Sequence, residues 1–349
     1  MKTAILLSNL GTPKSPYPKD VKTYLKEFLM DEGVINLPYI LRWLLVHGII
    51  LNTRPKKSSK AYQKIWMKNG SPLMVYTTQF ASQLQTLLGD EFLVEVSMRY
   101  QEPSISSALE KIKKEKIKEI IFIPLYPQYS EATTGSTIEK FLKEYHKLQM
   151  TIPFKIIKNF YNTSQYVEAM VNTTQEILNK TEYDHLLFSY HGLPEDHLKK
   201  KYKECLASLE CCDQINPDKN ECYRAQCLKT TSLIAKRLNL KKNKYSITFQ
   251  SRLGRAKWIS PYTDQTLMQL PQSGVKKIAV ICPSFISDCL ETLEEIQITG
   301  KELFIENGGE KFTLIPCLND HSIWVNKFSE LIQKSVQTQS AHQSEPALI

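Results

Sequence analysis

Short apolar segments alternate with longer segments of helical periodicity, and this alternation constrains the possible fold more than any other feature. Eight segments are rich in β-branched and other apolar residues, as expected for strands that are covered on both faces. They are residues 4–10, 93–98, 120–125, 154–160, 185–190, 245–249, 277–282 and 312–315. The segments between them carry apolar residues at helical spacing, as at Phe80, Leu84, Leu87 and Leu88. Strands that alternate with helices predict an α/β fold with parallel sheets.

The chain length and the strand count together predict two similar lobes. The chain has 349 residues, a single domain commonly holds about 150, and the strand segments divide about four and four. We therefore expect an N-terminal lobe over residues 1–153 and a C-terminal lobe over residues 154–334. Residues 335–349 are rich in Gln and Ser and have little to bury, so we expect a disordered tail.

The composition excludes several classes of protein. Hydrophobic residues make up 42% of the chain and charged residues 23%, which is typical of a globular protein with a core. The net charge of +9 favours anionic partners. No nucleic-acid motif accompanies the lysine-rich stretches 111–118 and 199–201, which are typical of solvated helix faces. The sequence contains neither G-x-G-x-x-G nor a P-loop, which disfavours a nucleotide enzyme.

The sequence predicts a cytoplasmic protein. The apolar residues 4–10 are too few for a signal-peptide core, and no small-residue cleavage site follows them. No uninterrupted apolar stretch reaches the ~18 residues of a membrane span. The nearest approach, residues 34–51, contains Pro38, Arg42 and His47. Contact with a membrane surface remains compatible with this pattern.

Residues that follow strands are the candidates for chemistry, because open parallel sheets bind ligands beyond the carboxyl ends of their strands. His191 follows the segment 185–190 directly, and an imidazole can accept a proton near neutral pH. The alternative is a histidine that only holds its turn together. Asp288 and Glu291 have the spacing of a capping box, which favours a helix cap over a carboxylate that holds a cation or relays protons.

Five of the eight cysteines lie within 23 residues: Cys205, Cys211, Cys212, Cys222 and Cys227. In a cytosolic chain such a concentration indicates a metal centre rather than disulfides. Four thiolates can bind Zn²⁺ or an iron–sulfur cluster, and the spacing is not the paired C-x2-C of a common zinc ribbon. Adjacent cysteines rarely both ligate one cluster, so we favour Cys212 as a ligand and Cys211 as the spare cysteine.

Taken together, the strand-end stretches resemble the ferrochelatase family, whose enzymes insert ferrous iron into porphyrin to make haem. The resemblance covers the chain from Ser8 to about Pro316. It rests on NLGTP (9–13), GSP (70–72), MRY (98–100), PLYPQYSEATTGS (124–136), SYHGLP (189–194), FQSRLG (249–254), Trp258 and DCLETLEE (288–295). It implies two Rossmann-like lobes of the chelatase type with a porphyrin cleft between them. It also implies insertion of Fe²⁺ into protoporphyrin IX with release of two protons, the last step of haem biosynthesis.

The resemblance assigns roles to individual residues. His191 falls on the active-site histidine of the family and Glu291 on its essential glutamate, with the substrate Fe²⁺ at this pair. We expect His191 to take a pyrrole proton, and Glu291 to bind Fe²⁺ or to relay protons. Residues 34–51 resemble the hydrophobic lip through which porphyrin enters from a membrane. Porphyrin-pocket or metal-path positions fall on Leu10, Tyr62, Arg99, Tyr126, Ser130, Trp258, Phe285 and Asp288.

The sequence departs from the family pattern at two places. Many members have a histidine two residues before the glutamate, where this chain has Cys289. Some relatives bind a [2Fe-2S] cluster with cysteines that include a group near the C-terminus, but no cysteine follows Cys317 here. The chain is instead similar to a bacterial subgroup that carries its [2Fe-2S] cluster in an internal segment, where residues 205–227 fall.

Other functions remain as alternatives. A coproporphyrin ferrochelatase or a cobalt chelatase would share these motifs. An iron–sulfur sensor on a chelatase scaffold would keep the cysteines but tolerate the loss of His191 and Glu291. A basic nucleic-acid binder is a third hypothesis, disfavoured by the absence of a motif. The oligomeric state is not predicted by the sequence.

Overall fold

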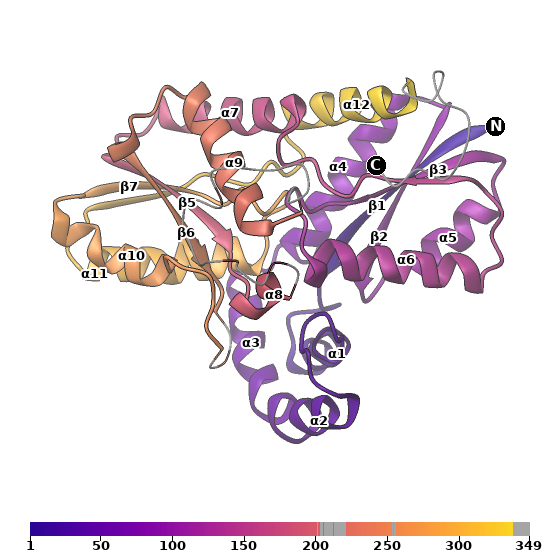
Figure 1. The fold of residues 1–349 in the computed structure, drawn as a ribbon, viewed down its shortest axis with the longest axis horizontal. Helices are drawn as coiled ribbons and strands as arrows, with labels where there is room; N and C mark the ends of the chain where they lie inside the picture. The colour runs from indigo at the N-terminus through magenta and orange to yellow at the C-terminus, as the bar shows by residue number, and fades with distance from the viewer. Residues whose placement is uncertain are drawn as a thin grey trace. The chain divides into compact units, whose positions relative to one another are not determined.

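A computed structural model of the chain contains two units, each built on a parallel sheet flanked by helices (Figure 1), which confirms the predicted fold class. The structure describes residues 1–337 except 201, 203–204, 206–211, 213–220, 253 and 255. The first unit comprises Met1–Tyr126, Glu131–Asn159 and the chain from Asp320 onward. The second comprises Pro127–Ser130 and Phe160–Asn319.

The sheet of the first unit has the strand order β2-β1-β3-β4, with all described pairs parallel. Its strands are β1 (Lys2–Gly11), β2 (Phe92–Tyr100), β3 (Ile117–Pro124) and β4 (Phe154–Ile156). The α-helices of this unit are α1 (Pro18–Leu29), α2 (Tyr39–Trp43), α3 (Leu51–Ile65), α4 (Pro72–Leu88), α5 (Ile105–Lys113), α6 (Ser136–Lys147) and α12 (Ser322–Gln337). Two π-helical segments, η1 (Leu44–Ile50) and η2 (Glu131–Gly135), complete it.

The sheet of the second unit has the order β6-β5-β7-β8 and is also parallel. Its strands are β5 (His185–His191), β6 (Tyr245–Gln250), β7 (Lys277–Ile281) and β8 (Lys311–Leu314). Its helices are α7 (Ser164–Leu178), α8 (Glu195–Lys199), α9 (Tyr223–Arg237), α10 (Thr263–Gln269) and α11 (Lys301–Glu306). Short 3-10 turns, η5 (Lys242–Lys244) and η6 (Pro271–Ser273), and a π-helix, η7 (Glu291–Gly300), join them.

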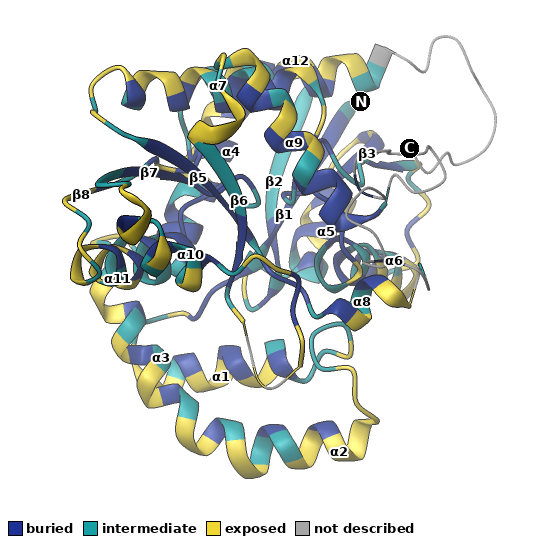
Figure 2. Cartoon of the chain, turned by 60° about the vertical axis from the view of Figure 1, so that its left-hand side comes forward, coloured by how far each residue is buried: buried dark blue, intermediate teal, exposed yellow. Residues whose placement is uncertain are grey.

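The strands form where the sequence is apolar on both faces, because helices cover both sides of each sheet (Figure 2). In the first unit, Leu6 and Phe122 lie in a core where the Phe122 and Phe141 rings stack 4.2 Å apart. In the second, Leu187 and Val280 are fully buried. Burial of each such side chain contributes about 1.5–3 kcal/mol to the free energy that stabilises the fold.

The structure corrects the expected lobe boundary at residue 153. Phe154 pairs with Ile120 of β3, so β4 completes the first sheet, and the first unit continues to Asn159. Of the expected strand 154–160, residues 154–156 form β4. The sequence pattern located the segment but did not show which sheet it joins, because that depends on pairing with a distant strand.

The structure also corrects the C-terminal boundary. Helix α12 belongs to the first unit and not to the second. Its Trp324 is fully buried and stacks on Phe80 of α4 with ring centroids 5.9 Å apart. The helix continues to Gln337, so the expected tail is helical over residues 335–337, and residues 338–349 lie outside the described part of the chain.

Candidate active site

The imidazole of His191 lies at the carboxyl end of β5, in the centre of the second sheet. Leu186 to Tyr190 are buried, whereas His191 is half-buried. His191 is therefore the first residue of this strand whose side chain is partly exposed. Its Nδ1 lies 2.6 Å from the carbonyl oxygen of Gly192. Because a carbonyl oxygen only accepts, Nδ1 carries the hydrogen and Nε2 of the neutral ring is left as the proton acceptor.

Aromatic rings and a glycine shape the surroundings of His191. The ring centroid of Phe285 lies 6.2 Å and that of Trp258 lies 6.4 Å from the imidazole. A Cβ atom on Gly192 would lie 2.7 Å from the carbonyl oxygen of Gln250 and 3.1 Å from the Trp258 ring. Glycine therefore lets the His191 turn approach β6, where the Gly192 amide donates to Gln250 over 2.8 Å.

Glu295 is a carboxylate beside His191 that the sequence analysis missed. It accepts hydrogen bonds from the amide and the hydroxyl of Ser251, over 2.7 Å and 2.5 Å. Burial raises the pKa of Glu295, the Ser251 hydrogen bonds and the charge of His191 oppose the rise, and Glu291 adds to it. Ser251 holds a positive φ of 67°, uncommon for a residue other than glycine. The available signal was the four-residue spacing of Glu291 and Glu295, which places both on one helix face.

Glu291 begins the π-helix η7, and its side chain is not used as the expected cap. The Thr292 hydroxyl instead accepts from the amide of Cys289 over 3.0 Å and donates to the Asp288 carboxylate over 2.9 Å. The carbonyl of Glu291 accepts from Gln250 Nε2 over 2.8 Å. The half-buried Glu291 carboxylate forms a side-chain hydrogen bond with the Cys289 thiol and lies near Glu295, on a π-helix of the kind often found at functional sites.

Asp288 is buried, and its carboxylate accepts hydrogen bonds that stabilise the fold. It accepts from Asn319 Nδ2 over 2.7 Å and from the Cys317 amide over 3.4 Å, and its own amide donates to Asn319 Oδ1 over 2.8 Å. These bonds fasten the start of η7 to the segment that follows β8. A role for Asp288 in binding porphyrin stays a prediction.

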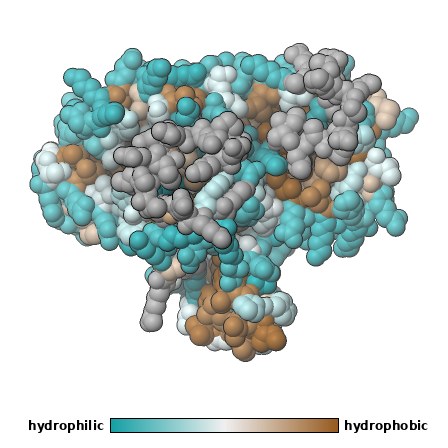
Figure 3. All heavy atoms as spheres, viewed as in Figure 1, coloured by the Kyte–Doolittle hydropathy of each residue, from teal (hydrophilic) through white to brown (hydrophobic). Residues whose placement is uncertain are grey.

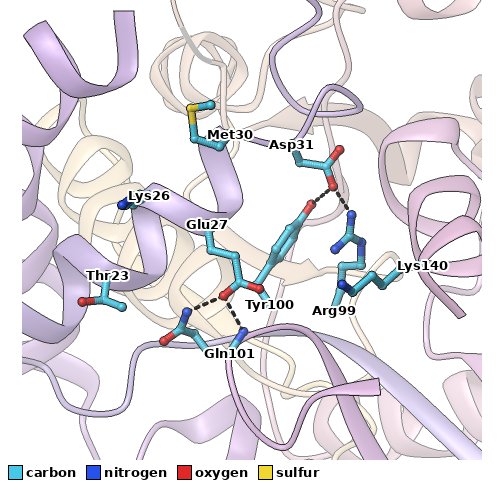
Figure 4. Close-up of a pocket in the computed structure, with 9 residues that line it drawn as sticks. All are labelled: Thr23, Lys26, Glu27, Met30, Asp31, Arg99, Tyr100, Gln101 and Lys140. Atoms are coloured by element: carbon cyan, nitrogen blue, oxygen red, sulfur yellow. Dashed lines mark hydrogen bonds and ion pairs between the residues drawn. The ribbon is translucent and has the colours of Figure 1, made fainter. Parts of the chain in front are cut away.

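In the first unit, Arg99 belongs to a charged cluster at the carboxyl end of β2 (Figure 4). Its guanidinium forms an ion pair with Asp31, and its Nε donates to the Ser136 hydroxyl over 2.9 Å. Tyr100 and Ser136 also donate to the Asp31 carboxylate, over 2.7 Å and 2.8 Å. Burial raises the pKa of Asp31, but the Tyr100 hydrogen bond and the charge of Arg99 outweigh it, so the pKa is lowered.

An open pocket of about 520 Å³ lies beside this cluster (Figure 4). Arg99, Asp31 and Tyr100 contribute to its wall, with residues of α1 and Lys140 of α6. Arg99 is thus held by Asp31, and its predicted contact with porphyrin stays a prediction.

The other predicted residues are distributed over both units. Ser130, Trp258 and Phe285 lie in the second unit with His191 and Glu291, whereas Leu10, Tyr62 and Tyr126 lie in the first with Arg99. Tyr62 is buried in α3, and its ring makes a T-shaped contact with that of Trp66. Leu10 is half-buried near the end of β1, and burial raises the pKa of Tyr126.

The cysteine segment is described in part. Cys205, Cys212, Cys222 and Cys227 are buried, whereas Cys211 lies outside the described residues. Cys212 and Cys222 pack with Ala225, Tyr202 packs against them, and the Tyr202 carbonyl accepts from the Cys205 amide. Thiols of this kind suit iron–sulfur or zinc chemistry. Within the described part of the chain, however, no three or more potential metal ligands are grouped to hold an ion.

Comparison with known proteins decides the family. The ferrochelatase family model matches residues 2–336. The chain belongs to the ferrochelatase family. It is 48% identical to a ferrochelatase of Bdellovibrio bacteriovorus over 95% of this chain and 99% of that protein. It is 46% identical to one of Coxiella burnetii, over 96% and 94% of the two chains, and 44% identical to one of Legionella pneumophila, over 96% and 99%. Family membership confirms the predicted enzyme class, a metal chelatase.

Solved structures of chelatases share the fold. SirB from Bacillus subtilis, determined with Fe³⁺, matches with a TM-score of 0.57 over 98% of both chains at 12% identity. The sirohydrochlorin chelatase SirB of the subspecies spizizenii, in complex with cobalt, gives a TM-score of 0.55 at 13% identity. At such low identity these matches support the fold alone, whereas the family model and the similar ferrochelatases carry the family assignment.

Proposed function

We propose that this chain inserts Fe²⁺ into protoporphyrin IX, forming protohaem and releasing two protons. The observation that carries the proposal is the meeting, in one unit, of His191 with the carboxylates of Glu291 and Glu295. A proton acceptor beside two carboxylates supplies what porphyrin metalation needs, namely a base for the pyrrole protons and oxygen ligands for a divalent cation.

The chemistry follows from the porphyrin itself. Two N–H protons occupy the centre of the free macrocycle, and the metal cannot bind until they leave. Nε2 of His191 is the acceptor for a pyrrole proton, while Nδ1 stays fixed on the Gly192 carbonyl. Glu291 and Glu295 then hold Fe²⁺ or carry the proton away along η7. The rings of Phe285 and Trp258 offer the macrocycle apolar contact, and binding energy of this kind can hold it distorted toward the base.

The test is anaerobic mixing of the purified protein with protoporphyrin IX and Fe²⁺, with loss of porphyrin fluorescence and growth of the haem spectrum as readouts. We expect His191→Ala to abolish insertion and to retain porphyrin binding, because the base is lost but the pocket is kept. His146→Ala is the matched control, since this exposed histidine lies on α6. Near-normal turnover by His191→Ala would remove the role of His191 as the base.

The porphyrin preference is tested in the same assay. Coproporphyrin carries more carboxylates than protoporphyrin, so preference for it would favour the coproporphyrin alternative. Faster insertion of Co²⁺ than of Fe²⁺ would favour a cobalt chelatase. Porphyrin binding without insertion of any metal would favour the iron–sulfur sensor module.

We further propose that four of Cys205, Cys211, Cys212, Cys222 and Cys227 bind a [2Fe-2S] cluster, with Cys211 as the spare. The support is the burial of the four described thiols near the start of α9, with cysteines of the type that ligates such clusters. When bound, the cluster would supply a redox-active and cross-linking centre. Iron and sulfide content per chain should fall in Cys222→Ser and stay unchanged in Cys211→Ser.

Peripheral contact with the cytoplasmic face of a membrane is also part of the proposal. Among the described residues, no helix combines the length and the hydrophobicity needed to cross a bilayer. The segment α2–η1 nevertheless exposes a group of large apolar and aromatic side chains, and hydrophobic residues are coloured brown at this segment in Figure 3. They are Tyr39, Ile40, Leu41, Trp43, Leu44 and Ile49. Apolar patches of this kind mark protein or membrane interaction sites.

A further inference from the structure

Tyr223, the first residue of α9, reaches the backbone of His191. Its hydroxyl donates to the His191 carbonyl oxygen over 2.7 Å and lies 3.0 Å from Ser284 Oγ. A phenol has one hydrogen, and the carbonyl takes it, so Ser284 is the donor of the second bond. Ser284 precedes Phe285 in the loop after β7. One buried hydroxyl therefore joins the loop ends of β5 and β7 that carry the imidazole and its aromatic neighbour.

The same side chain contacts the cysteine segment. Tyr223 forms a side-chain hydrogen bond with the Cys227 thiol, one helical turn further along α9. Cys222 is the N-cap residue of α9 and directly precedes Tyr223. Cys227 is completely buried, and Cys222 and Cys212 lie close enough to influence its charge state. A change in the thiols, such as gain or loss of a metal centre, therefore acts directly on the contacts that place Tyr223.

We propose that Tyr223 is the positioning residue of His191 and that it transmits changes at Cys222 and Cys227 to the imidazole. The Tyr223 hydroxyl is protonated at neutral pH, since an ordinary phenol has a pKa of about 10. The hydroxyl is thus a permanent donor to His191. Movement of the start of α9 alters the His191 carbonyl, and through the adjoining peptide it alters the Gly192 carbonyl that fixes Nδ1. The inference rests on the proposed role of His191 as the base.

The first test compares Tyr223→Phe with Tyr166→Phe. Both remove a buried hydroxyl that donates to a backbone carbonyl, but Tyr166 donates to Pro283 over 2.5 Å and not to His191. With histidine labelled with ¹⁵N, and the His191 signal assigned from His191→Ala, we expect Tyr223→Phe to shift the imidazole nitrogen signals. We also expect it to lower kcat about tenfold to a hundredfold with unchanged porphyrin affinity, because the base is displaced. Tyr166→Phe should do neither.

The second test examines transmission from the thiols. Cys222→Ser keeps the start of α9, because serine is a favoured N-cap residue, and Cys227→Ser is nearly isosteric. Each should shift the His191 signals in the presence of Tyr223 and produce little further shift in the Tyr223→Phe background. Equal shifts in both backgrounds would overturn the transmission, and a Tyr223→Phe spectrum like that of Tyr166→Phe would overturn the positioning. The spectra report on His191 whether or not iron is inserted, so failure of the proposed function is seen separately.

Discussion

The carboxylate of Glu295 shows how burial sets the behaviour of a single residue at the candidate site. Its pKa is raised in the folded chain, so the native state binds more protons than the unfolded state once the pH rises above the ordinary pKa of glutamate, about 4.3. Stability is therefore lost as the pH rises from that value through the folded pKa. A buried carboxylate that lowers the stability of the fold at neutral pH is typical of a functional site, where it can exchange protons or bind a cation.

Removal of this charge should stabilise the chain at neutral pH. We expect Glu295→Gln to unfold at a higher temperature than the wild type near pH 7, by a few degrees, and the two to converge below about pH 4. Thermal unfolding measured from pH 4 to 8 checks this, with Glu302→Gln on the exposed face of α11 as the control. A constant difference between Glu295→Gln and the wild type across the pH range would contradict it.

At the scale of elements, Asp31 ties the segment that begins the lip to the sheet of the first unit. It accepts from the Gly33 amide over 2.8 Å as well as from Tyr100, Ser136 and Arg99. Arg42 holds the next part of the lip by donating to the carbonyls of Ile35 and Leu37. The exposed apolar face of α2–η1 thus lies on a segment that the hydrogen bonds and ion pair of Asp31 and the hydrogen bonds of Arg42 hold in place.

Asp31→Asn should destabilise this anchor in a pH-dependent way. Its lowered pKa means that the carboxylate contributes stability above the ordinary aspartate pKa, about 3.9, and loses the contribution as the pH falls through the folded pKa. We expect a loss of about 1–3 kcal/mol of unfolding free energy at pH 7, since Arg99 loses its ion-pair partner. Urea unfolding at pH 7 and below pH 4 measures it, with exposed Asp90→Asn as the control. An equal loss at both pH values would reject the explanation.

The lip itself is tested with lipid vesicles. Ile40 and Leu44 are 71% and 53% exposed and lie four residues apart, on one helix face. We expect Ile40→Ser combined with Leu44→Ser to weaken binding to phosphatidylglycerol-containing vesicles at least about tenfold, because apolar area no longer leaves water. Leu87→Ser is the control, since Leu87 is 47% exposed but lies on α4. Equal binding by all variants in vesicle sedimentation would exclude a membrane role for this face.

At the scale of the whole molecule, the chain leaves the first unit and returns to it. After β8 it re-enters at Asp320, and α12 packs its Trp324 and Phe328 against Phe80 of α4. Lys155, beside β3 in the first sheet, donates to the Ser335 carbonyl over 3.1 Å. The first unit is therefore complete only after the second has been synthesised.

Removing the Trp324 side chain, which packs against Phe80 of α4, should destabilise the first unit. We expect Trp324→Ala to lower its free energy of unfolding by about 3–5 kcal/mol, the usual effect of removing a buried tryptophan. Gln333→Ala, on the exposed side of α12, should change it little. Hydrogen exchange of the β1 and β3 amides reports the difference, and equal protection in Trp324→Ala and wild type would show that α12 is not needed by that sheet.

Much of the fold could be predicted because strands in covered parallel sheets are continuous apolar runs. Residues 4–10 lie within β1, 93–98 within β2 and 185–190 within β5. The strand-end position of His191 follows from the same local pattern. The capping box that the spacing of Asp288 and Glu291 indicated does not form, because the Asp288 amide donates to Asn319 Oδ1, a residue that is distant in the sequence.

The sequence by itself determined the strands, the helices between them, the family motifs and the position of His191 at a strand end. These features depend on residues close together along the chain, where the apolar period is visible. Only the tertiary structure decided that β4 and α12 join the first unit, that Ser251 receives Glu295, and that Tyr223 supports His191. Each of these contacts joins residues more than 30 positions apart, and their selection depends on how whole elements pack.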